Sequence, residues 1–250
     1  MRTRILLVTA AVVTMSGLMM AQKPKSKKEV DAVLAVQNAT TADARIAAVD
    51  NLISNFADTE FKSWALTQAA HAEQAKGDSA KAEVYAEQAI KADPKSYEAM
   101  LLLAGDVASH TREFDLDKDD KLARATKLAD EGMKLAAVAP KPNPQIPDAQ
   151  WDGVKKDNVA DGHKALGLVA LVQKKYDVAV DEFHKAVYDA ASPDPSDRVR
   201  LASALIDSGK PDDAEAELAK IQADPKAADA VKRFATSEQA RAEKVKAAKK

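Results

Sequence analysis

The chain has no cysteine, only eight glycines among 250 residues, and aromatic side chains at only 4%. Without cysteine it has no disulfide framework, no cysteine-ligated zinc and no thiol nucleophile. A sheet protein of this size would use more β-branched and aromatic residues, and more glycine in its turns. The formal net charge of −2 gives no overall attraction to nucleic acid. These shortages exclude whole classes of site and argue against a β-rich fold.

Helix-forming residues make up most of what is present. Hydrophobic residues account for 46% of the chain and charged residues for 30%, with alanine dominating the apolar set. Alanine, leucine, glutamate and lysine have the strongest helix propensities. The composition therefore predicts an all-α chain.

The N-terminal residues have the pattern of a targeting signal. A short basic start (Met1 to Arg4) is followed by an uncharged run from Ile5 to Met20 and then by Ala21. This order of basic, apolar and small residues is that of a secretory signal peptide. We expect residues 1–21 to be cleaved and the protein to be exported, periplasmic or secreted. The alternative is a retained membrane anchor, for which the run is short. Residues 22–28 are expected to be a flexible leader.

Small and large apolar residues recur at fixed spacing further along. Leu166, Gly167 and Ala170 fall on one face of a predicted first helix. Ala179, Phe183 and Ala186 then follow at i, i+4 and i+7, which is one stripe of a second helix, with Tyr176 at the turn. Alternation of small and large side chains is what two closely packed antiparallel helices need.

This pattern resembles the tetratricopeptide repeat, a helix–turn–helix unit of about 34 residues. His163 stands where the family often has tryptophan, and we expect it to serve packing. Anchored on Ala179, the same pattern recurs around Ala82 and Ala214, and weaker copies centre on Ala44 and Ala125. The resemblance implies an α-solenoid of about five helix–turn–helix repeats over residues 29–228. The expected repeats are 29–62, 63–96, 97–139, 160–193 and 195–228.

Uneven spacing between the anchors places two insertions, near residues 111–120 and 140–158. The second holds four prolines, and Trp151 comes after them; we expect this tryptophan to anchor a long helix on the array. Residues 229–250 are expected to form a capping helix and a charged tail. Ala227, Val231 and Phe234 fall at i, i+4 and i+7, a stripe that can cover the open end of the last repeat.

No motif in the chain points to catalysis. The alternate aspartates from Asp115 to Asp120 lack the glycine and glutamate of a calcium loop, and they are better explained as an acidic loop that caps the next helix. The four histidines show no metal-ligand spacing. We therefore expect no enzyme activity, no metal, no cofactor and no nucleic-acid partner.

The resemblance implies a protein–protein interaction scaffold that binds a peptide or helical segment of a partner in the groove formed by its first helices. An alternative is an envelope-associated structural protein that uses its basic C-terminal tail to contact anionic membrane or cell-wall polymer. Mapped through the anchors, the expected groove positions are Trp64, His71, Gln74, Lys164, Leu168, Leu171, Ser203 and Ile206.

The targeting signal gives the first testable prediction. The native protein should begin at or near Gln22, because Ala21 is the small residue that precedes the expected cut. N-terminal sequencing of the protein from its source checks this. An intact Met1 on a cytoplasmic protein would contradict it.

Overall fold

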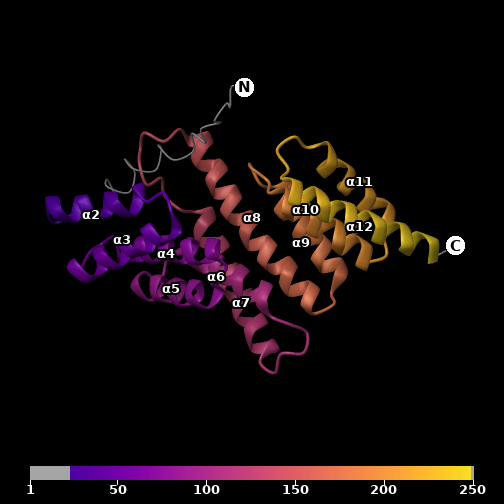
Figure 1. The fold of residues 1–250 in the computed structure, drawn as a ribbon, viewed down its shortest axis with the longest axis horizontal. Coiled ribbons are helices and arrows are strands. Elements are labelled where there is room, and N and C mark those ends of the chain that lie inside the picture. The colour runs from indigo at the N-terminus through magenta and orange to yellow at the C-terminus, as the bar shows by residue number, and fades with distance from the viewer. Residues whose placement is uncertain (1–22, 249–250) are drawn as a thin grey trace. The chain divides into compact units, whose positions relative to one another are not determined.

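The computed structural model describes residues 23–248, so the predicted signal peptide (1–21) lies outside the described residues. Every regular element in that range is a helix, and within each of the chain's two compact units neighbouring helices pack side by side (Figure 1). The prediction of an all-α solenoid of about five helix–turn–helix repeats with a capping helix is confirmed. The helices are α2 (Lys27–Asn38), α3 (Ala42–Asn55), α4 (Lys62–Lys76), α5 (Ser79–Ala92), α6 (Tyr97–His110), α7 (Lys118–Ala137), α8 (Asp148–Val172), α9 (Tyr176–Tyr188), α10 (Pro195–Asp207), α11 (Pro211–Ala223) and α12 (Asp229–Ala248). The pairs that pack side by side include α4 and α5, α6 and α7, and α10 and α11.

Local chemistry explains where many of these helices begin and end. Thr41, Asp78 and Asp194 each accept a hydrogen bond from a backbone N–H of the first turn that follows. Gly77 and Gly209 end two first helices at φ 79° and 78°, a left-handed conformation that favours glycine. Between α8 and α9, 35 residues before Gly209, Lys174 takes the same conformation at φ 58°.

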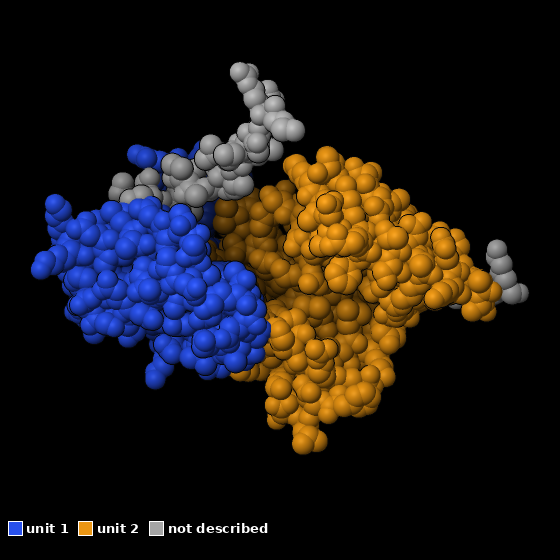
Figure 2. Space-filling model, in the orientation of Figure 1, with its two compact units in different colours: residues 1–93, 139–151 blue, residues 94–138, 152–250 orange. Residues whose placement is uncertain are grey.

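The chain divides into two compact units, coloured separately in Figure 2. Unit 1 comprises residues 1–93 and 139–151, and unit 2 comprises residues 94–138 and 152–250. In unit 1, α2, α3 and α4 share a core of Val33, Val36, Val49, Leu52, Phe61, Ala65 and Ala69. In unit 2, α9 to α12 share a core built on Phe183, Leu201, Leu218 and Ile221.

The predicted leader and insertions have more structure than the sequence suggested. In the leader, Lys25 Nζ lies 2.5 Å from a carboxylate oxygen of Asp58, and the Ser26 hydroxyl caps α2. The first insertion is a loop that ends where α7 begins at Lys118. The second is a loop only as far as Pro147, because α8 begins at Asp148 and runs for 25 residues. Trp151 is 9% exposed and its Nε1 donates to the Ala139 carbonyl over 2.9 Å, which ties the start of α8 to the loop before it.

Helix α12 packs against α10 and α11, and of the predicted stripe Ala227 and Val231 lie against the core. Val231, Ala235, Ala242 and Val245 lie against the core of unit 2, whereas Phe234 is 69% exposed. The prediction that Phe234 covers the core is wrong. Ala235 continues the stripe four residues after Val231, and each residue turns a helix by about 100°, so the residue before Ala235 points away from the core.

A tight small-to-large contact joins α8 and α9. A Cβ added to Gly167 would come within 2.8 Å of the ring of Phe183, which is fully buried. Gly167→Ala should therefore destabilise unit 2 by about 1–3 kcal/mol. Urea denaturation followed by circular dichroism measures the loss.

Gly105→Ala is the matched control. Gly105 also lies inside a helix of unit 2, but an added Cβ there would meet no heavy atom within 4 Å. Alanine is the better helix former, so this change should leave stability unchanged or raise it by up to about 1 kcal/mol. A Gly167→Ala protein as stable as the wild type would show that the helix pair is less tightly packed than described.

Candidate partner-binding surface

The first helices of the repeats carry the positions that we expected to face a groove. In unit 2 these helices are α8 and α10, and α12 follows in the same register. Equivalent residues are 35 apart and form three rows: Lys164, Val199 and Phe234; Leu168, Ser203 and Glu238; and Leu171, Ile206 and Arg241. We call these nine residues the first-helix face of unit 2.

The expected residues of unit 1 lie on α4 and differ in exposure. Trp64 is half-buried and packs against the core that α4 shares with α2 and α3. His71 and Gln74 are exposed further along the same helix. Part of the Trp64 surface therefore serves the fold, and the rest faces solvent.

On α8, all three expected residues are half-buried. Leu168 and Leu171 pack against the core of unit 2. Lys164 forms an ion pair with Asp161 on the preceding turn. Burial opposes the charged form of Lys164, but the carboxylates of Asp161 and Asp197 outweigh it and raise the pKa of this lysine. The surface around Leu168 is therefore an apolar strip beside a charged pair that is already satisfied.

The expected residues of α10 are covered by α12. Ile206 is 3% exposed and belongs to the core, so its expected place on an open surface is wrong. Ser203 donates a hydrogen bond to Glu238 over 2.9 Å and accepts one from Arg241 over 3.1 Å. Arg241 also pairs with Asp207. The packing of α12 on α10 is a tertiary contact. The repeat spacing in the sequence does not show which side chains α12 covers.

Phe234 is the surface residue that the sequence analysis misplaced. It lies 35 residues after Val199, which lies 35 residues after Lys164, so the three positions are equivalent. The side chain of Phe234 is 69% exposed. Aromatic side chains are enriched among the residues that contribute most to binding at protein interfaces. The signal that could have found it is the 35-residue spacing, continued one step past the last full repeat.

A three-residue ion cluster joins the two helices of each of the last two repeats. In the fourth repeat, Glu182 of α9 lies 2.6 Å from His163 Nδ1 of α8 and 2.7 Å from Lys185 Nζ. In the fifth repeat, Glu217 of α11 lies 2.5 Å from Arg198 Nη1 of α10 and 2.7 Å from Lys220 Nζ. Each member lies 35 residues from its counterpart. We call this arrangement the interhelix staple.

The staple corrects the role expected for His163. Its ring binds a carboxylate and does not merely fill space, and His184 stacks on Tyr188 with ring centroids 4.5 Å apart. Burial acts to raise the pKa of Glu182, but hydrogen bonds from Lys185 and His163 outweigh it and hold the pKa below the ordinary value. The pKa of Glu217 is lowered in the same way, by Lys220, Tyr188 and Arg198 against the effect of burial.

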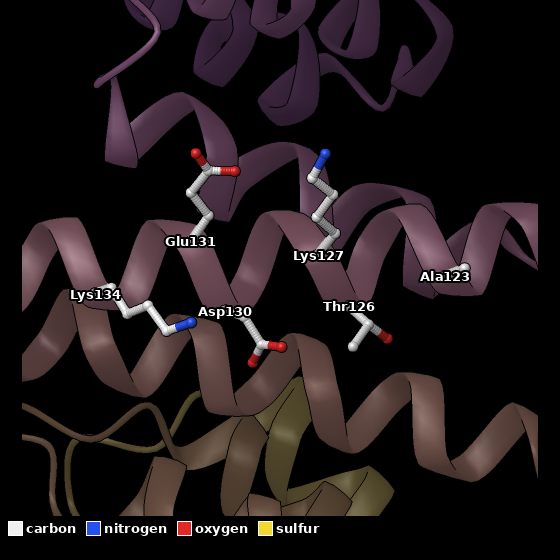
Figure 3. Close-up of a pocket in the computed structure, with 6 residues that line it drawn as sticks. All are labelled: Ala123, Thr126, Lys127, Asp130, Glu131 and Lys134. Atoms are coloured by element: carbon white, nitrogen blue, oxygen red, sulfur yellow. The ribbon is translucent and has the colours of Figure 1, made fainter.

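Two other polar regions carry no site. A hollow of about 700 Å³ lies over α7, where Lys127 and Glu131 point to one side of the helix and Asp130 and Lys134 to the other (Figure 3). These side chains do not converge on a common point. In the acidic loop, Asp115 and Asp117 bind Lys121. Within residues 23–248, no group of carboxylates and histidines is arranged to hold a metal ion.

Comparison with solved structures identifies the fold. A thermophilic TPR protein of Thermus thermophilus aligns with 88% of this chain and 96% of its own length, at 18% identity and a TM-score of 0.56. A tetratricopeptide repeat protein from Parabacteroides merdae aligns with 88% of this chain and 90% of its own, at 12% identity and a TM-score of 0.37. No protein-family model matches the sequence, and no curated protein does. The chain has the fold of tetratricopeptide repeat proteins.

The interhelix staple predicts a pH dependence. The lowered pKa of Glu182 means that its ionised form stabilises the fold above its ordinary pKa of 4.5, and that this contribution is lost as the pH falls through the folded-state value. Glu182→Gln should cost about 1–2 kcal/mol of stability at pH 7, and the difference from wild type should shrink below pH 4.5.

Asp181→Asn is the matched control, since Asp181 is exposed beside Glu182 and the change removes the same charge. It should alter stability by less than about 0.5 kcal/mol. Chemical denaturation of the three proteins between about pH 3 and pH 7 provides the test. A deficit in Glu182→Gln that persists undiminished at the acid end of this range would contradict an electrostatic role.

Proposed function

We propose that this protein is a non-enzymatic interaction scaffold that binds a peptide or helical segment of a partner protein on the first-helix face of unit 2. The observation that carries the proposal is Phe234, an aromatic side chain held on a packed helix yet 69% exposed. The fold supports it, because helical repeats present extended surfaces to protein partners.

The chemistry beside Phe234 suggests what the partner offers. Val199 and Leu168 add half-buried apolar surface in the adjacent first helices. Lys164 on this face pairs with Asp161, and Arg200 beside the face pairs with Asp197 over 2.7 Å, so both cations are already matched by carboxylates. Burial raises the pKa of Asp197 above its ordinary value. A segment with apolar anchors fits this surface better than a phosphate or a nucleic acid.

The alternative function, contact of the basic C-terminal tail with an anionic membrane or cell-wall polymer, has less support. Lys246 lies 2.6 Å from Asp212 and 2.9 Å from Glu215, and Arg241 pairs with Asp207 and Glu238. These cations hold α12 on the repeats. They are therefore less available to bind an external anionic surface.

Location is also part of the proposal. We propose that the chain is exported, on the strength of the basic start, uncharged run and Ala21 in the sequence. In the part of the chain that the structure describes, no helix combines the length and the apolar character that crossing a membrane requires.

Phe234→Ala tests the binding surface. Because Phe234 does not contribute to the core, the variant should keep the wild-type melting temperature. Peptides selected for binding to the full wild-type chain from a displayed library should lose about 2 kcal/mol of binding free energy, which is roughly thirtyfold in Kd.

Phe114→Ala is the control, since Phe114 is also exposed, at 87%, but lies on the loop between α6 and α7. Its affinity for the same peptides should match wild type. Leu168 is a poorer test, because it packs against the core and its loss would also weaken the fold. Equal binding by Phe234→Ala and wild type would place the working surface elsewhere.

A further inference from the structure

Helix α12 stands in the register of a first helix, and the face that would receive its second helix is open. On α8, Gly167 and Ala170 face α9 and are buried. The residues 35 positions later on α10, Ala202 and Leu205, are buried as well. The next step along the chain reaches Ser237 and Ala240 of α12, and both are exposed. Figure 1 shows α12 beside α10 and α11, with no described helix of unit 2 following it.

The interhelix staple also has its first member on this face. His163 and Arg198 each bind the glutamate of the following second helix. The equivalent residue on α12 is Arg233, which is exposed. Arg233, Ser237 and Ala240 together make up what we call the open face of α12. A basic residue followed four positions later by a small residue lies there, as it does on the two earlier first helices, where His163 precedes Gly167 and Arg198 precedes Ala202.

The two second helices already present define what such a face accepts. In α9, Ala179 is followed by Glu182, Phe183 and Lys185; in α11, Ala214 is followed by Glu217, Leu218 and Lys220. The alanine and the large apolar residue are buried in both. The glutamate binds the cation of the first helix and the lysine binds the glutamate. The shared pattern is Ala-x-x-Glu-(Phe or Leu)-x-Lys on one helical stripe.

We propose that the open face of α12 is a docking site for an amphipathic helix of a partner protein that carries this pattern. Its glutamate binds Arg233, and its large apolar side chain lies over Ser237, as Phe183 lies over Gly167. Charge complementarity supports this occupant: both second helices carry aspartate in their first turn, and the glutamate of each binds the basic residue at the Arg233 position, which is His163 on α8 and Arg198 on α10. This site is distinct from the first-helix face, on which Phe234 lies.

The face needs no rearrangement to accept a helix. Ala235 and Ala242 on the opposite side of α12 are fully buried in the core of unit 2. Arg241 and Lys246 hold the same helix to α10 and α11 through ion pairs. The helix that presents Arg233 is therefore fixed by contacts that the incoming helix does not disturb.

A peptide with the sequence of residues 211–224, cross-linked on the side away from Glu217 to keep it helical, serves as the probe. It is titrated into the full chain by fluorescence anisotropy. We expect binding to wild type, and binding about tenfold weaker to Arg233→Glu, which replaces an attraction by a repulsion. Ser237→Leu, which fills the small position, should weaken binding as strongly.

Lys232→Glu is the matched control: it makes the same charge change one residue away, on the flank near α11, and should change the Kd less than about twofold. A peptide with Glu217→Lys should bind Arg233→Glu better than it binds wild type. This reversal separates a direct Arg233 contact from a general effect of charge. Circular dichroism melts confirm that each variant remains folded.

Three outcomes would overturn the proposal. One is no binding of the probe at millimolar concentration. Another is binding that Arg233→Glu and Ser237→Leu leave unchanged, since the peptide would then occupy another surface. The third is a wild-type chain that is dimeric by light scattering and becomes monomeric in both variants, because the occupant would then be a second copy of this chain.

Discussion

The close approach of a small residue on one helix to a large residue on its neighbour is the contact on which the repeats depend. Gly167 leaves the space that the fully buried ring of Phe183 fills. A single amphipathic helix cannot bury its apolar stripe, so each hairpin needs this contact before it can stack on the next. The interhelix staple between His163 and Glu182 joins two helices that are packed in this way.

Charge is organised around the same hairpins. The acids and bases of the last repeats pair across helix junctions, as His163 does with Glu182 and Arg198 with Glu217. Half-buried pairs of this kind fix the register of two helices more than they add stability. Arg200, Lys210 and Lys246 of unit 2 are likewise paired with carboxylates of this chain.

The sequence predicted the repeats because their chemistry is local. Gly167, Ala179 and Phe183 all lie within one helical hairpin, and proline or glycine lies near the ends of its helices. It did not predict the buried state of Ile206 or the exposure of Phe234. Both depend on how α12 lies on α10, and helices of alternating alanine and charge give a weak rotational signal. Glu182 and Glu217 are 35 residues apart, and this recurrence was visible in the sequence. It could have predicted the interhelix staple, but His163 was assigned a packing role instead.

The many buried alanines have a thermodynamic consequence. On α4 and α5 the fully buried positions include Ala65, Ala69, Ala82, Ala86 and Ala89. An alanine exposes little apolar area when the chain unfolds, and the heat-capacity change of unfolding scales with that area. Unit 1 should therefore have a small heat-capacity increment per residue and a broad, flat curve of stability against temperature. Such a unit changes little in stability across a wide thermal range, and cold weakens it less than it weakens a core of leucine and phenylalanine.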